Sequence, residues 1–255
     1  MSAMDLNAAT TQFPANVRMV LVEPEHPGNV GSAARALWTM GMQQLVVVKP
    51  ACDPRGEEAY WLAHAASTVI DNLQVVDTLE QALAGTVFSV GTTRRHRRVA
   101  YPVFLPGEAV SQIRERAPSQ PAAIVFGRES SGLTNAELAL CSIQSTIPCA
   151  RENHSLNLAQ AVLVYATALH DASLLPDQRD FHWNLVSHAE MENFYRRLEA
   201  ILVLLDTRPA TSMESYLARF RRVLSRMALE TRDVRLLHKL LNRIEAVVDS
   251  GQSGV

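Results

Sequence analysis

The sequence predicts an α/β fold, a parallel sheet with helices on both faces, followed by a small all-α extension. Two observations support this fold class. Short apolar runs alternate with segments of helical period up to residue 173, and parallel strands need such helical crossovers between them. Glycine-containing or polar loops follow several of the apolar runs, which in an open α/β sheet is where ligands bind.

The first half of the chain begins with an apolar run, residues 17–22, that predicts a buried strand. Residues 29–40 follow with their apolar side chains on one side of a helix, and Gly41 occupies the C′ position at which helices commonly end. The remaining elements of this half are a strand at residues 45–48, a helix at 57–66, a short strand at 75–76, a short helix at 79–83 and a strand at 86–90.

The second half predicts a helix at residues 108–116, a strand at 122–126, a short helix at 135–140 and a last strand at 143–147. The next segment, SLNLAQAVLVYATAL from Ser155 to Leu169, is apolar at nearly every position, which predicts a helix buried on most sides. Ser155 and Asn157 stand at its start, where unpaired backbone N–H groups point outward. They are therefore either N-cap residues or part of a ligand site.

These patterns divide the chain into a disordered tail (residues 1–16), a sheet domain (17–173), a linker (174–189), a helical module (190–249) and a short tail (250–255). The helical module contains three amphipathic patterns with arginines on their outer sides, at residues 190–205, 213–227 and 234–248. Because a module of this size buries little apolar surface alone, we expect it to dock on the sheet domain or on a second subunit.

The composition is that of an ordinary soluble protein, with 255 residues and a net charge of −2. No apolar run approaches the roughly 20 residues of a membrane helix, and the N-terminus lacks the features of a signal peptide. We therefore expect a cytoplasmic protein without membrane contact. Cys52, Cys141 and Cys149 have no metal-ligand spacing and are expected to be packing residues. No pair of histidines has metal spacing either, so we expect no metal.

Arginine greatly outnumbers lysine, since Lys49 and Lys239 are the only lysines. The arginines cluster in two places, one at Arg94, Arg95, Arg97 and Arg98 and the other at Arg219, Arg221, Arg222 and Arg226. Arginine suits bidentate contacts with phosphate, but a run of arginines is also typical of a solvated face. Composition alone therefore leaves nucleic-acid binding and surface charge as equal alternatives.

Four loops carry residues suited to chemistry: GNVGSAAR (28–35), GTTRRHRR (91–98), FGRESSGLT (126–134) and IPCARENHSLNLAQA (147–161). None of them is a phosphate-binding Walker loop. The GNVG segment also lacks the third glycine and the later acidic residue of a dinucleotide-binding fingerprint. No serine stands in a G-x-S-x-G elbow, so the hydrolase motif is absent from the sequence.

Taken together, the loops resemble the three motifs of the knotted methyltransferases of the SPOUT class, in particular the tRNA ribose 2′-O-methyltransferases. N-x-G-x-x-A-R matches residues 29–35, F-G-x-E-x-x-G-L matches 126–133, and S-L-N-L-A matches 155–159. The helical module, with its FYRRLE and FRRVLSR segments, is similar to that of the bacterial enzymes that methylate the ribose of the pyrimidine at anticodon-loop position 32. The resemblance covers nearly the whole chain except about the first 15 residues.

The resemblance implies a sheet whose C-terminal section threads through a loop to form a trefoil knot. It implies S-adenosylmethionine as methyl donor, S-adenosylhomocysteine as product and tRNA as substrate, with an RNA-binding or docking role for the helical module. The implied donor-binding residues are Thr92, Thr93, Gly127, Ile147, Ser155 and Leu156. The implied catalytic residues are Arg35, Asn29, Glu129, Ser155 and Asn157, and the implied RNA-binding residues are Arg95 and Arg97.

The reaction that the resemblance implies needs an aligned 2′-hydroxyl and an acceptor for its proton. The family assigns the role of base to the arginine of the first motif, here Arg35. A guanidinium has a pKa above about 12 and is rarely deprotonated, so a neighbouring phosphate is an alternative acceptor. In that case Arg35 would hold the phosphate, Asn29 and Glu129 would fix the guanidinium, and Ser155 and Asn157 would orient the ribose.

The resemblance also implies a homodimer with a shared active site. The helix from Ser155 to Leu169 and the N-terminal helix with Trp38 and Met40 are both more apolar than one sheet face can cover. In the resembling family these two helices form the subunit interface, and Arg35 of one chain faces the donor held by the other. Three alternatives remain: a ribosomal RNA ribose methyltransferase, a non-catalytic RNA-binding protein on the same scaffold, and a small-molecule α/β enzyme.

One prediction concerns the arginine run after the second loop, where the family places an important RNA-facing arginine at the position of Arg97. Replacing Arg95 and Arg97 by alanine is expected to weaken tRNA binding and to flatten its salt dependence, because fewer counterions are released in each complex. Titrations of tRNA at several salt concentrations measure this slope. A slope equal to that of the unsubstituted protein would assign these residues a structural role.

Overall fold

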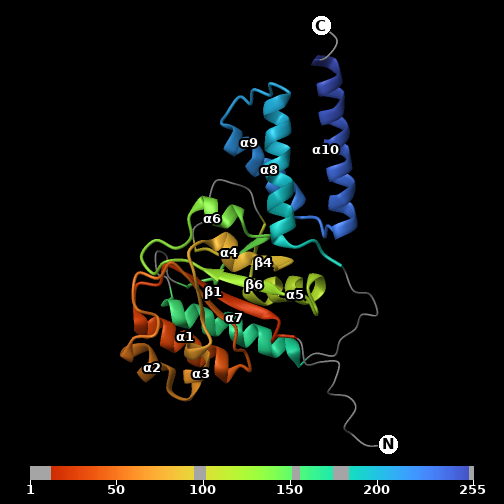
Figure 1. The fold of residues 1–255 in the computed structure, drawn as a ribbon. Coiled ribbons are helices and arrows are strands. Elements are labelled where there is room, and N and C mark those ends of the chain that lie inside the picture. The colour runs from red at the N-terminus through yellow and green to blue at the C-terminus, as the bar shows by residue number, and fades with distance from the viewer. Residues whose placement is uncertain (1–12, 95–101, 151–155, 175–183, 253–255) are drawn as a thin grey trace, which may run out of the picture.

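The computed structural model describes residues 13–94, 102–150, 156–174 and 184–252 (Figure 1). Its centre is a seven-stranded sheet in the order β3-β2-β1-β6-β4-β7-β5, and all the paired strands are parallel. The strands are β1 (Val17–Val22), β2 (Leu45–Val48), β3 (Gln74–Val76), β4 (Phe88–Thr92), β5 (Val103–Phe104), β6 (Ala122–Phe126) and β7 (Ile143–Ser145). The predicted fold class is confirmed, whereas the trefoil knot stays a prediction.

Helices cover both faces of the sheet because the strands have apolar side chains on both sides. One face packs against α1 (Pro27–Thr39), α2 (Glu57–Ala63), α3 (Ser67–Asp71), α5 (Pro106–Arg116) and α7 (Leu158–Ser173). The opposite face packs against two short helices, α4 (Leu79–Leu83) and α6 (Asn135–Ala139). Figure 1 shows α1 and α7 on one side of the sheet and α4 and α6 on the other.

Several predicted boundaries are wrong by a few residues. The predicted helix at 57–66 is α2 followed by a 3-10 turn, His64–Ala66, and the further helix α3 was not predicted. The strand expected at 86–90 is β4, two residues later, because Thr86 lies in a buried turn where its hydroxyl donates to Leu83 O at 2.7 Å. The predicted helix end is correct at Gly41, whose φ of +77° suits the residue after a helix.

The helix predicted from Ser155 begins instead at Leu158 and continues to Ser173. Asn157 is its N-cap, and the Asn157 side chain accepts a hydrogen bond from Ala159 N at 2.8 Å. The two-residue strand β5 was not predicted, because its flanking prolines indicated a loop. The predicted tail also ends earlier than residue 16, since Asn16 Nδ2 donates to Ala117 O and Gln120 O.

The extension consists of α8 (His188–Leu204), α9 (Met213–Leu224) and α10 (Thr231–Gln252), which share a small apolar core of their own. Helix α10 reaches into the predicted C-terminal tail. Two arginines expected on the outer sides lie between the helices instead. Arg221 forms a bidentate pair with Glu192 and stacks 4.3 Å above the ring of Tyr195, and Arg197 of α8 donates to Asn242 Oδ1 of α10 at 2.7 Å.

The extension docks on the sheet domain, one of the two arrangements expected. Helix α8 contacts α4, and α9 contacts α6. The described end of the predicted linker takes part in this docking, because Leu185 and Val186 are buried. His188 fixes the start of α8: its backbone N donates to Thr86 O at 2.6 Å, and its ring Nε2 lies 2.7 Å from Leu140 O. No helix in the described part of the chain is long and apolar enough to cross a membrane.

Candidate functional site

A cavity opens at the carboxyl ends of β4, β6 and β7, where the second, third and fourth motif loops meet. The volume of this cavity is about 160 Å³. Its lining combines hydroxyl, backbone and apolar groups, which suits a ligand with both polar and apolar parts. The lining residues are Thr92, Thr93, Arg94, Phe126, Gly127, Arg128, Glu129, Ser130, Ser131, Gly132, Leu133, Ser145, Thr146, Ile147, Cys149, Leu156, Leu158, Ala161 and Tyr165.

The floor of the cavity is a rigid polar and aromatic group. Tyr165 of α7 donates its hydroxyl to Ser145 Oγ at 2.7 Å, and Ser145 Oγ donates to Phe104 O at 2.9 Å. The rings of Tyr165 and Phe126 meet edge to face with centroids 5.5 Å apart. Burial raises the pKa of Tyr165 to about 12, although the hydrogen bond with Ser145 opposes this shift. Tyr165 therefore stays neutral and acts as a fixed wall.

The loop after β6 forms one wall of the cavity and folds tightly back on itself. A Cβ atom on Gly127 would lie 2.2 Å from the carbonyl carbon of Gly132 and 2.2 Å from Leu133 N. Gly132 has a φ of +70°, and its backbone N donates to Arg128 O at 2.9 Å. Both glycines of the F-G-x-E-x-x-G-L motif are therefore required by backbone geometry.

A chain of hydrogen bonds connects residues from all three motifs. Asn157 Nδ2 donates to Asn29 Oδ1 at 2.8 Å, and Asn29 Nδ2 donates to Glu129 Oε1 at 2.8 Å. The other carboxylate oxygen, Glu129 Oε2, accepts from the backbone N of Glu25 at 3.0 Å. The amide groups of both asparagines are thereby oriented by a single carboxylate, although the two residues of each side-chain hydrogen bond are 100 and 128 positions apart in the sequence.

The structure brings most of the predicted site residues together. Five of the six residues predicted to bind the methyl donor, namely Thr92, Thr93, Gly127, Ile147 and Leu156, line the cavity. The Thr92 hydroxyl donates to Val125 O at 2.9 Å, so mainly the backbone groups of Thr92 remain for a ligand. The sixth residue, Ser155, and the predicted RNA-binding residues Arg95 and Arg97 lie outside the described residues. Ligand binding by each residue stays a prediction.

Arg35 is the predicted residue that the structure places elsewhere. Its side chain is exposed on α1 and makes no hydrogen bond or ion pair with any residue that the structure describes. Asn29 and Glu129 bond to each other, and Arg35 of the same chain is not among their described partners, so the expectation that they fix the guanidinium stays a prediction. The helix is largely buried as expected, but Arg35 lies on the side of α1 that also exposes 41% of Trp38.

Some cavity residues were missed by the sequence analysis. Tyr165 is an aromatic residue in an otherwise aliphatic helix, and this feature of the sequence could have marked it as a cavity residue. Arg128 occupies a variable position of its motif and gave no signal. Cys149 was expected to be a packing residue, but it is exposed and lines the cavity, whereas Cys141 is buried as expected. Within the described residues, no group of three or more His, Cys, Asp and Glu side chains is arranged to hold a metal.

Comparison with known proteins identifies the family. Residues 16–167 match the SpoU rRNA Methylase family. The chain belongs to the SpoU methylase family. The resemblance found in the three motifs is thereby confirmed, because this match covers the motifs and the whole sheet domain up to α7.

Relatives within the SpoU methylase family resemble the chain beyond the sheet domain. The tRNA (cytidine/uridine-2′-O-)-methyltransferase TrmJ of Pectobacterium atrosepticum is 37% identical over 92% of this chain and 98% of its own length. The protein of the same name from Salmonella choleraesuis is 39% identical over 90% and 96%. The crystal structure of TrmJ from Z. mobilis ZM4 matches with a TM-score of 0.78 at 29% identity, over 89% of this chain and 98% of that one.

The geometry of Asn157 generates a stability prediction. Asn157→Ala removes both the N-cap of α7 and the contact with Asn29, whereas Asn157→Ser keeps a good N-cap but is too short to reach Asn29. We expect the alanine variant to be less stable than the serine variant by about 1 kcal/mol, because the cap is the difference between them. Urea denaturation of both variants measures this difference. Equal stability would show that Asn157 does not act mainly as a cap.

Proposed function

We propose that this SpoU methylase transfers a methyl group from S-adenosylmethionine to a ribose 2′-hydroxyl of tRNA, at the pyrimidine in anticodon-loop position 32. The observation that carries the proposal is the hydrogen-bonded chain Asn157–Asn29–Glu129 beside a cavity lined by the motif loops. The relatives named tRNA (cytidine/uridine-2′-O-)-methyltransferase support tRNA over ribosomal RNA, because they match the helical extension as well as the sheet domain.

The cavity fits a methyl donor of this kind. S-adenosylmethionine supplies, when bound, a methyl group on a positively charged sulfonium. Two arginines, Arg94 and Arg128, line the cavity together with one carboxylate, Glu129. The Arg128 guanidinium is paired with Glu23 and Glu137, so Glu129 can favour the cationic end of a ligand locally. The tight glycine turn at residues 127–132 brings backbone groups to the cavity wall, where they can bond polar groups of a ligand. The apolar floor formed by Phe126 and Tyr165 offers a surface for a flat ring.

The polar residues beside the cavity orient the acceptor. Glu129 fixes the amide of Asn29, and Asn29 in turn fixes Asn157, so the amide at the start of α7 is held in one orientation. Such preorganisation lowers the entropic cost of aligning a ribose hydroxyl. The proton of that hydroxyl goes to a neighbouring RNA phosphate held by Arg35, because guanidinium groups are poor proton acceptors. We propose that no metal is needed, since a sulfonium is already an activated leaving group.

We further propose a homodimer in which Arg35 completes the site of the partner subunit. Arg35 has no carboxylate partner among the described residues, and it lies on an exposed side of α1 beside Trp38. Helix α7, which packs against α1, exposes 41% of Leu163. An isologous interface would cover this same surface on both subunits. A cytoplasmic location follows from the tRNA substrate that we propose.

The first test of the proposed function identifies the product. Incubation with labelled S-adenosylmethionine and tRNA, followed by digestion to nucleosides, is expected to give 2′-O-methylcytidine or 2′-O-methyluridine from position 32. A matched tRNA with 2′-deoxyribose at position 32 is the control, and it is expected to give no label because the acceptor hydroxyl is absent. Label in a base, or in ribosomal RNA alone, would contradict the proposal.

The second test addresses the shared site. Arg35→Ala and Asn157→Ala are each expected to inactivate the homodimer. After the two variants are unfolded and refolded together, each heterodimer is expected to hold one intact site, so activity partly returns. Each variant refolded alone provides the control. Heterodimers demonstrated by differential tagging, yet without recovered activity, would mean that each chain carries a complete site.

A further inference from the structure

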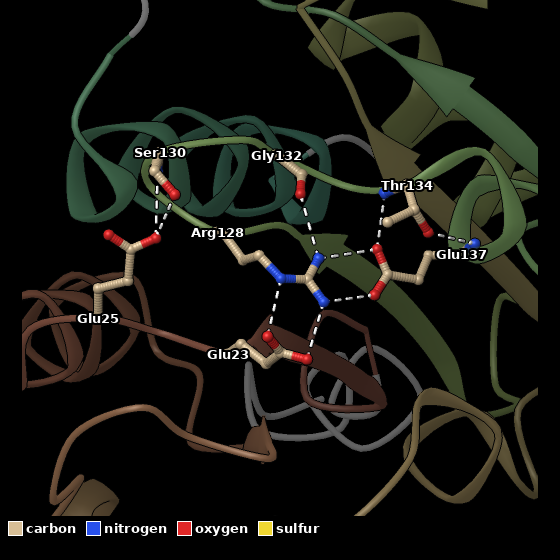
Figure 2. Close-up of polar contacts among 7 residues, drawn as sticks. All are labelled: Glu23, Glu25, Arg128, Ser130, Gly132, Thr134 and Glu137. Carbon is tan, nitrogen blue, oxygen red and sulfur yellow. Dashed lines mark hydrogen bonds and ion pairs between the residues drawn. The ribbon is translucent and has the colours of Figure 1, made fainter.

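Arg128, the residue before Glu129, lies between the carboxylates of Glu23 and Glu137, as Figure 2 shows. On one side, Arg128 Nε donates to Glu23 Oε2 at 2.9 Å, and Nη2 lies 2.8 Å from Glu23 Oε1. On the other side, Nη2 and Nη1 donate to the two carboxylate oxygens of Glu137 at 2.9 and 3.1 Å. Nη1 also reaches Gly132 O, 3.3 Å away, within the loop itself.

These contacts join three separate parts of the chain around the cavity. Glu23 follows the end of β1, Arg128 lies in the loop after β6, and Glu137 belongs to α6. The side chains of Arg128 and Glu137 are only 18% and 17% exposed, and charged groups so enclosed need partners. The hydrogen bonds with Glu23 and then with Glu137 raise the pKa of Arg128, and the hydrogen bond from Arg128 lowers the pKa of Glu23.

Two further observations show that both partners of Arg128 lie at constrained points of the backbone. Glu23 has a φ of +46°, which is unfavourable for a residue other than glycine and persists only where surrounding contacts hold it. Glu137 is also engaged in the capping box of α6, in which its carboxylate accepts from Thr134 N at 2.7 Å. Arg128 therefore connects a strained turn to the start of a helix, with the tight 127–132 loop between them.

Two other residues of the same loop, Glu129 and Ser130, form hydrogen bonds with Glu25. Ser130 bonds through its hydroxyl to the Glu25 carboxylate, and the Glu25 backbone donates to Glu129 Oε2 at 3.0 Å. Glu129 thus bonds to Asn29 while Arg128, its neighbour, bonds to Glu137. Displacement of Arg128 would move Glu129 and the cavity wall together, because the two residues are consecutive in a loop without slack.

We propose that Arg128 is a positioning residue for the methyl-donor site, which acts by bridging Glu23 and Glu137 and so holds the 127–132 loop and Glu129 in place. This inference rests on the proposed function, because the ligand whose site it positions is S-adenosylmethionine. Arg128 is not itself a ligand for the donor, since its guanidinium is occupied by two carboxylates and a carbonyl. A lysine at this position cannot reproduce the contacts, because an ammonium lacks the planar fork.

The test measures S-adenosylmethionine binding directly, by calorimetry on the full chain without tRNA. Arg128→Ala and Arg128→Lys are both expected to weaken binding about tenfold or more, since small displacements of a site have effects of this size. Methylguanidinium in solution is expected to restore part of the affinity of Arg128→Ala, whereas methylammonium is not. The matched control is Arg208→Ala, which removes an exposed arginine that also bonds a carboxylate, Asp206, and it is expected to bind as the unsubstituted protein does.

Glu137→Gln provides a second variant with nearly unchanged shape, for the case in which Arg128→Ala does not fold. It is expected to weaken binding severalfold while keeping a circular dichroism spectrum like that of the unsubstituted protein. Undiminished affinity in Arg128→Lys or Glu137→Gln would overturn the inference. So would loss of affinity in Arg128→Ala that methylguanidinium and methylammonium affect equally. Failure of the unsubstituted protein to bind S-adenosylmethionine would instead refute the proposed function, so the two failures are distinguishable.

Discussion

Charges at the carboxyl edge of this sheet have to be paired across segments that are distant in the sequence, and this pairing determines the shape of the cavity. Glu129 is satisfied by Asn29 and by the backbone of Glu25, and Arg128 is satisfied by Glu23 and Glu137. Partly buried charged groups without such partners would be costly. These contacts therefore hold the loop between β6 and α6 in the conformation that forms one wall of the cavity.

The sheet itself could be predicted because its strands are buried on both faces. Buried parallel strands consist almost entirely of apolar residues, as in β1, β2 and β6, and such runs stand out in a sequence. The order of the strands could not be predicted, because alternation of strand and helix is a local pattern and says nothing of which strands pair. The short strand β5 was missed because its flanking prolines indicated a loop, and its two residues become a strand only by pairing with β7.

The position of a site residue could be predicted where a sequence motif marks it. It could be predicted less well where it depends on the direction in which a side chain points from its helix. Asn29, Glu129 and Asn157 come together, as their motifs indicated, but the partners of Arg35 did not follow from the burial of its helix. Successive helical residues point about 100° apart, so Arg35 faces outward although Ala33, Ala34 and Leu37 beside it are buried. Average burial of a helix therefore predicts poorly the environment of any one residue on it.

The arginines of the helical extension show that charge counting overestimates the capacity to bind phosphate. Arg221 and Arg197 give their donors to groups within the extension, so those donors are not available to RNA. The positive charge that meets RNA has to come from arginines without such partners. Among the described residues, Arg35 forms no ion pair, and Arg94 lines the cavity directly before the arginine run. Part of the positive charge of the extension therefore maintains its own fold and is not available for the proposed reaction, whereas Arg35 lies exposed on α1 and Arg94 lies at the cavity.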